Sequence, residues 1–231
     1  MKSKASVQKL GNNRRIDLIV TDLGGTLVKT DGAIMAAVRR AAQELGIPEG
    51  NADPVYDVFG TSIWEYVRAY LPQQHRDRTD ECHEGFWKLF PYEVVDQISP
   101  FDGVEGALRE LKDRGVRLAV LSGLRLEAIE SILSSMTFRD WDVVRSSMMY
   151  PTESGNSRAL GIVSLVEEFG VAPNRTIYIG DTDHDVRQAR RAGVVSAVVK
   201  TGGQAVKHLD KIQAENPDHL LAAWPHLCGV V

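Results

Sequence analysis

The chain has 231 residues, of which 43% are hydrophobic and 25% charged, a composition typical of a folded globular protein. No apolar run approaches the ~18 residues that a membrane-spanning helix needs, the N-terminus lacks the apolar segment of a secretory signal, and the two cysteines are far apart. A membrane protein, a disulfide scaffold and a cysteine-based zinc site are therefore excluded, and we expect a cytoplasmic location.

The formal net charge of −4 hides an uneven distribution. Residues 1–15 carry five basic side chains and no acidic one, whereas the rest of the chain is acidic. We expect 1–15 to form a flexible basic tail, although such a tail can also touch nucleic acid. The acidic remainder argues against a nucleic-acid-binding domain, so we expect no nucleic-acid partner.

The first predicted element is a buried strand at 16–21, which ends at Asp22 and a pair of glycines. Apolar side chains then follow helical spacing from Ile34 to Leu45, where a glycine and a proline stop the helix. From about 52 to 98 the chain is rich in aromatic residues and shows no strand pattern. We expect two or more short helices there, with a small core of their own.

Beyond residue 100, strand and helix patterns alternate. The predicted strands are 116–121, 143–144, 176–179 and 194–199, and the helices lie near 104–115, 126–133, 162–170 and 181–192. This alternation is typical of βαβ units and a parallel sheet. We therefore predict an α/β fold, with a Rossmann-like core in three α/β/α layers formed by 16–29 and 99–231. An α-helical cap is inserted at 30–98.

Polar side chains stand where three of the predicted strands end: Asp22, Ser122 and Asp181. Ligands of open α/β sheets bind at the carboxyl ends of strands, so these side chains can converge on one site. Asp181 and Asp185 are four residues apart, and a helix that begins there places both carboxylates on one face. Three carboxylates need protons or a hard cation to neutralise them, and ligand sets of oxygen alone favour Mg²⁺.

Four segments resemble the haloacid dehalogenase-like (HAD) hydrolase superfamily. They are DLGGTL at 22–27 as the first motif, LSG at 121–123 as the second, GDTDHD at 180–185 as the fourth, and PFDGV at 100–104 where the chain re-enters the core. One hundred residues separate Asp22 from Ser122. In this superfamily that spacing implies a helical cap between the first two motifs, as in phosphoglycolate phosphatase-like and phosphonatase-like members.

The resemblance implies a Mg²⁺-dependent hydrolase of the phosphatase type, which acts on a small phosphorylated metabolite through an aspartyl-phosphate on Asp22. The implied metal ligands are Asp22, the carbonyl of Gly24, Asp181 and, directly or through water, Asp185. Phosphate oxygens would be held by Ser122 and Gly123, with Thr26 stabilising the turn of the phosphate site. Arg158 is the nearest match to the lysine of the third motif, and a helix-terminal surface residue is the other interpretation of it.

Gly24 departs from the family pattern, because phosphatases of this kind carry a second Asp there as general acid and base. Such catalysis is typically worth about 10²–10⁴-fold in rate. The substrate, His184, a cap residue or bound water would have to replace it. Two alternatives stay open: a catalytically impaired binding or regulatory protein, and a phosphonatase-like hydrolase of a phosphonate. The latter needs a cap lysine, where this chain has Ile63. A homodimer is left open, and no membrane partner is expected.

Overall fold

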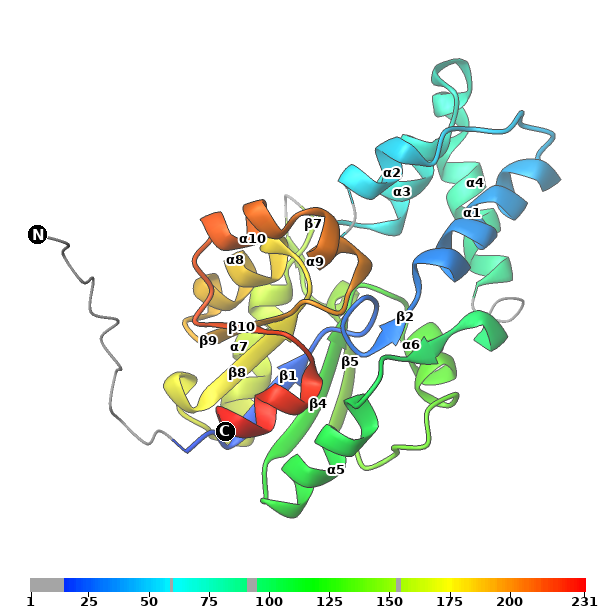
Figure 1. The fold of residues 1–231 in the computed structure, drawn as a ribbon. Helices are drawn as coiled ribbons and strands as arrows, with labels where there is room; N and C mark the ends of the chain where they lie inside the picture. The colour runs from blue at the N-terminus through cyan, green and yellow to red at the C-terminus, as the bar shows by residue number, and fades with distance from the viewer. Residues whose placement is uncertain (1–14, 59, 91–94, 153–154) are drawn as a thin grey trace, which may run out of the picture.

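The computed structural model describes residues 15–58, 60–90, 95–152 and 155–231 (Figure 1). The tail expected at 1–15 lies outside the described residues, except for Arg15. Within the described ranges, no helix combines the length and the apolar character needed to cross a membrane.

A six-stranded parallel sheet forms the centre of the fold, with strand order β10-β9-β8-β1-β4-β5. The strands are β1 (Leu18–Thr21), β4 (Arg117–Ser122), β5 (Val143–Ser146), β8 (Thr176–Gly180), β9 (Val195–Val199) and β10 (His219–Leu221). The predicted α/β class is confirmed. The edge strand β10 was not predicted, because its three residues are too short to show a pattern.

Successive side chains of each strand point to opposite faces of the sheet. Both faces carry buried apolar side chains, and helices cover both. Leu18 and Val20 of β1 belong to the apolar cluster formed with α7 (Arg158–Phe169) and α8 (Asp183–Ala192). Ile19 belongs to the cluster on the other face, which includes α5 (Val104–Asp113) and α6 (Leu126–Leu133). This arrangement gives the three layers that the sequence predicts.

A short antiparallel pair, β2 (Val28–Lys29) and β3 (Ser99–Pro100), marks where the chain leaves the sheet and returns. The elements between them are α1 (Asp31–Glu44), α2 (Asp53–Asp57), α3 (Ile63–Tyr70), the 3₁₀ turn Gln73–Arg78, α4 (Thr79–Leu89) and the turn Val95–Gln97. Figure 1 shows α1–α4 as a lobe beside the sheet. The division at 30 and 98 stays a prediction.

The helical lobe does not have the separate small core that the sequence suggested. Its buried aromatic side chains, Tyr70, Phe86 and Phe90 among them, belong to the same apolar cluster as the α5 face of the sheet. Polar groups also join the lobe to the rest of the fold. Lys207 lies 3.5 Å from the ring centroid of Tyr56 in α2, and Arg125 lies 4.7 Å from that of Trp87 in α4.

Short elements complete the fold on either side of α7 and at the C-terminus. They are the turns Ser147–Met149, Pro173–Arg175 and Trp224–Gly229, the pair β6 (Pro151–Thr152) and β7 (Gly155–Asn156), and helices α9 (Gly203–Lys207) and α10 (Leu209–Ala214). The fully buried Trp224 donates its indole N–H to the carbonyl of Thr26 at 2.8 Å. The C-terminal segment therefore supports the turn that follows β1.

Candidate active site

The three predicted strand ends meet at one edge of the sheet. Thr21 pairs with Val120 of β4 and with Ile179 of β8, so the residues that follow lie at the same level. The backbone N–H of Asp22 donates to the carbonyl of Ile179 at 2.9 Å. Carboxylate oxygens of Asp22, Asp181 and Asp185 all lie within 4.8 Å of one another, and the three residues are buried. The predicted convergence of carboxylates is therefore present.

Two glycines let the backbone approach Asp181 closely. Gly25 has a φ of +76°, and a Cβ there would lie 2.5 Å from Asp181 Oδ2. A Cβ on Gly202 would lie 2.3 Å from the same oxygen. Asp181 Oδ2 is buried and has no hydrogen-bond partner within the described part of the chain. Because a buried carboxylate oxygen without a partner is costly, this oxygen points to a bound cation or proton.

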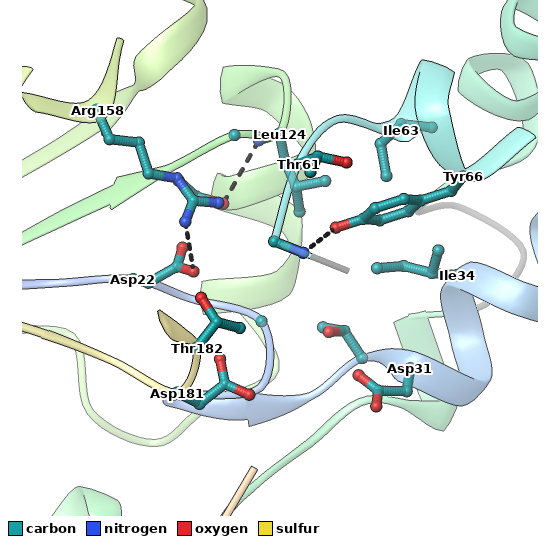
Figure 2. A pocket seen from close by; sticks show the side chains of 15 residues that line it. Asp22, Asp31, Ile34, Thr61, Ile63, Tyr66, Leu124, Arg158, Asp181 and Thr182 are labelled. Carbon is teal, nitrogen blue, oxygen red and sulfur yellow. Dashed lines mark hydrogen bonds and ion pairs between the residues drawn. The ribbon is translucent and has the colours of Figure 1, made fainter. Parts of the chain in front are cut away.

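Arg158 lies inside the site rather than on the surface. It is 8% exposed at the first position of α7, where Ser157 accepts the N–H of Leu160 and fixes the helix start. Its Nη1 lies 3.2 Å from Asp22 Oδ2 and 2.9 Å from Asp185 Oδ1 (Figure 2 shows the pair with Asp22). One guanidinium thus bridges two of the three buried carboxylates.

Asp185 is held by the chain's own donors on both oxygens. Its Oδ1 accepts from Arg158 and from the Tyr178 hydroxyl at 3.1 Å, and its Oδ2 accepts from the Thr182 hydroxyl at 2.6 Å. Thr182 caps α8, which begins at Asp183, so the expectation that Asp181 shares a helix face with Asp185 is wrong. Direct metal ligation by Asp185 would cost these bonds, which favours a supporting role for it.

The surroundings of the three carboxyl groups raise the pKa of two of them and lower the pKa of the third. Burial, reinforced by the Asp185 carboxylate and opposed by Arg158, raises the pKa of Asp22 to about 6. Burial and the charges of Asp185 and Asp22 raise the pKa of Asp181 well above its ordinary value. Although burial acts in the opposite direction, Arg158 holds the pKa of Asp185 below its usual range. A divalent cation would favour the charged forms of Asp22 and Asp181, which burial and the neighbouring carboxylates disfavour.

These residues fit a hard divalent cation. The available donors are carboxylate and carbonyl oxygens, one carboxylate oxygen is buried without a partner in the described structure, and no Cβ at Gly25 or Gly202 crowds it. Of the three carboxylates, those of Asp22 and Asp181 are free of the bonds that hold Asp185, so they are the ones that could hold such an ion.

A pocket partly open to solvent lies over this edge of the sheet (Figure 2). Its sheet end is lined by Asp22, Gly24, Ser122, Gly123, Arg158, Asp181 and Thr182. The remaining lining comes from α1 and its start, the loop before α3, α3 itself and Leu124: Thr30, Asp31, Ile34, Gly60, Thr61, Ile63, Tyr66 and Leu124. The Tyr66 hydroxyl accepts the N–H of Gly60 at 2.8 Å and so holds that loop over the pocket.

Other residues singled out from the sequence lie outside the pocket lining. Thr26 is fully buried, and its hydroxyl donates to Asp181 Oδ1 at 3.4 Å, so it helps to orient that carboxylate. His184 contacts the Gln188 side chain at 3.1 Å. Lys29 lies over the ring of Phe101. No lysine is among the described residues that line the pocket.

Sequence reasoning gave no site role to several lining residues, Thr30, Asp31, Tyr66 and Thr182 among them. An acidic residue at the first turn of a helix, as at Asp31, is an ordinary helix-start signal. Nothing in its spacing shows that the helix starts beside Asp22. That placement depends on how the chain turns back through β2.

A family model described as haloacid dehalogenase-like hydrolase matches residues 19–199, and the chain belongs to this family. The predicted family is thereby confirmed. The phosphoglycolate phosphatase of Aquifex aeolicus is 27% identical over 207 residues, which cover 89% of this chain and 92% of that protein. The phosphoglycolate phosphatase of Pseudomonas putida is 29% identical over 220 residues, which cover 90% of this chain and 78% of that protein.

Two further similarities concern a pyrophosphatase and a solved structure. Pyrophosphatase PpaX of Halalkalibacterium halodurans is 22% identical over 217 residues, covering 94% of this chain and 97% of that protein. The crystal structure of a predicted phosphoglycolate phosphatase from Haemophilus somnus superimposes with a TM-score of 0.81 at 18% identity, over 93% of this chain and 97% of that one. At that identity, the likeness shows the shared fold.

We predict that Asp22→Asn stabilises the metal-free protein at pH 8 by about 1–3 kcal/mol. A carboxyl whose folded pKa of about 6 exceeds its unfolded value destabilises the fold above both values, and the effect disappears below pH 4. The free energy of unfolding is measured by denaturant titration in EDTA, at pH 8 and at a pH below 4. Asp17→Asn, at the other end of β1, is the matched control. An Asp22→Asn protein less stable than the wild type at pH 8 would show that the pair with Arg158 outweighs burial.

Proposed function

We propose that this chain is a Mg²⁺-dependent phosphohydrolase, which releases phosphate from a small phosphorylated metabolite through an aspartyl-phosphate on Asp22. The observation that carries this proposal is the position of Asp22. It stands buried at a strand end, beside two further carboxylates and Arg158, and it opens onto a pocket. The relatives named phosphoglycolate phosphatase and pyrophosphatase support the same class of reaction.

The first half-reaction transfers the phosphoryl group to Asp22. The N–H of Leu23 holds Asp22 Oδ1 at 2.8 Å and Arg158 holds Oδ2, so the carboxylate has a fixed orientation. One of its oxygens attacks phosphorus, the bond from phosphorus to the leaving oxygen breaks, and that oxygen takes up a proton. Ser122 and the backbone at Gly123, which line the same end of the pocket, bind the phosphate oxygens.

The second half-reaction regenerates the carboxylate. Water attacks the phosphorus of the aspartyl-phosphate, the bond from phosphorus to Asp22 breaks, and inorganic phosphate leaves. Bound Mg²⁺ would supply charge neutralisation between the Asp22 carboxylate and the phosphate. Asp22, Asp181 and the carbonyl of Gly24 would hold it, while Arg158 and Asp185 keep Asp22 in place.

The site has no side chain at position 24 that could act as general acid and base. Gly24 has no side chain, and a Cβ there would lie 2.5 Å from Thr30 Oγ1. Thr30 is 1% exposed, so its hydroxyl occupies the space in front of position 24. A hydroxyl can orient water or the leaving oxygen, but it does not exchange protons near neutral pH as a carboxylate does. This observation favours slow turnover, and it is what keeps a binding or regulatory role as the second candidate function.

A phosphonatase-like reaction finds no corresponding support. That chemistry needs an amine that can form a Schiff base with the substrate. Ile63, which aligns with the cap lysine of phosphonatases, lines the pocket, and the described lining contains no lysine.

With Mg²⁺ and a panel of small phosphate esters, we expect phosphate release that falls by at least about 10³-fold in Asp22→Asn and stops in EDTA. Asp113→Asn, an exposed carboxylate on α5, is the control and should keep the wild-type rate. Equal release by the Asp22→Asn protein would contradict the role of Asp22 as nucleophile. Phosphate binding without any release by the wild type would support the second candidate function.

We predict that Gly24→Asp alone gives no gain in rate and destabilises the fold by about 1–3 kcal/mol, because its side chain collides with Thr30. The double variant Gly24→Asp with Thr30→Ala has room for the carboxylate, and we expect its kcat to rise by about tenfold or more above that of Thr30→Ala alone. Rates and melting temperatures of the four proteins test this. If the single and double variants behaved alike, Thr30 would not limit position 24.

A further inference from the structure

The end of the pocket away from Asp22 carries a carboxylate of its own. Asp31, the first residue of α1, lines the pocket together with Ile34, Ile63 and Tyr66. Figure 2 shows these side chains on the side opposite Asp22 and Arg158. A substrate whose phosphate lies at Asp22 must place its leaving group among them. Their chemistry therefore decides which leaving groups the pocket accepts.

Positive charge is scarce in this pocket. Arg158 is the single Lys, Arg or His among the described residues that line it, and it already bridges Asp22 and Asp185. Three basic residues of the helical lobe and its neighbours lie over aromatic rings and outside the pocket lining: Arg68 over Trp64, Arg125 over Trp87 and Lys207 over Tyr56.

A second anionic group on the substrate would therefore face the Asp31 carboxylate, and Arg158 is the one basic side chain among the described residues of the lining. The glycolate carboxylate of phosphoglycolate and the second phosphate of pyrophosphate are groups of this kind. An ammonium group in the same place would instead lie near Asp31, in a wall that Ile34, Ile63 and the ring of Tyr66 also line. In a partly desolvated pocket, reversing one charge beside a fixed carboxylate changes affinity by about tenfold or more.

We propose that this pocket selects phosphate monoesters whose leaving group carries an ammonium group, that Asp31 recognises this group, and that esters with a second anionic group are disfavoured. A hydroxyl-bearing leaving group ranks between the two. The proposal rests on the phosphohydrolase function proposed above and names its substrate class. It sets this chain apart from the relatives named for phosphoglycolate and pyrophosphate.

The test uses three esters of nearly equal size: carboxymethyl phosphate, 2-hydroxyethyl phosphate and 2-aminoethyl phosphate. With Mg²⁺, we expect kcat/KM for the amino ester to exceed that for the carboxy ester by about tenfold or more. Asp31→Asn should reduce this ratio by about tenfold, mainly through KM, and Asp31→Lys should invert it. Asp53→Asn is the matched control, because Asp53 is exposed and also begins a helix, α2. It should leave the ratio unchanged.

Two results would overturn the inference and leave the phosphohydrolase function intact. One is a preference of the wild type for carboxymethyl phosphate, and the other is an unchanged ratio in a folded Asp31→Asn protein. Release of phosphate from none of the esters would instead count against the proposed function. In that case, calorimetric titration of the Mg²⁺-loaded wild type with the same esters decides the inference. Tightest binding of 2-aminoethyl phosphate supports it, and tightest binding of carboxymethyl phosphate overturns it.

Discussion

The buried guanidinium of Arg158, placed between Asp22 and Asp185, is the interaction on which the rest of the site depends. Each buried charge costs several kcal/mol in lost solvation, and one cation cannot balance three carboxylates. Burial and the neighbouring carboxylates raise the pKa of Asp181, whose Oδ2 has no hydrogen-bond partner in the described structure. A divalent cation bound beside Asp181 would balance this charge.

The sheet supplies the fixed geometry for that arrangement. Because β1 lies between β4 and β8 and all three run parallel, their polar ends share one edge. Glycines at positions 25 and 202 admit close backbone approach to Asp181, and Trp224 supports the turn after β1 from the far end of the chain. The helical lobe then provides the opposite wall of the pocket. The proposed phosphate chemistry and the proposed leaving-group recognition thus belong to different parts of the fold.

The sequence predicted most of the core because periodicity and strand-end residues are local properties. The parallel sheet, the helical insertion and the positions of Asp22, Ser122 and Asp181 follow from them. The burial of Arg158 could not be predicted in this way, because the sequence around an arginine at a helix start is the same whether the side chain faces solvent or a carboxylate. Asp181 was wrongly placed on a helix face because the Thr182 cap starts α8 two residues later. Asp31 and Tyr66 were missed because their roles depend on how the lobe packs over the sheet.

Anomalous diffraction from crystals grown with Mn²⁺ in place of Mg²⁺ tests the central claim most directly. We expect one Mn²⁺ bound by oxygens of Asp22 and Asp181, with Asp185 still bonded to Arg158 and Tyr178. A site left empty at saturating Mn²⁺, or an ion bound to Asp185 with Arg158 displaced, would contradict the view that Arg158 and Asp185 form a fixed support for a metal held by the other two carboxylates.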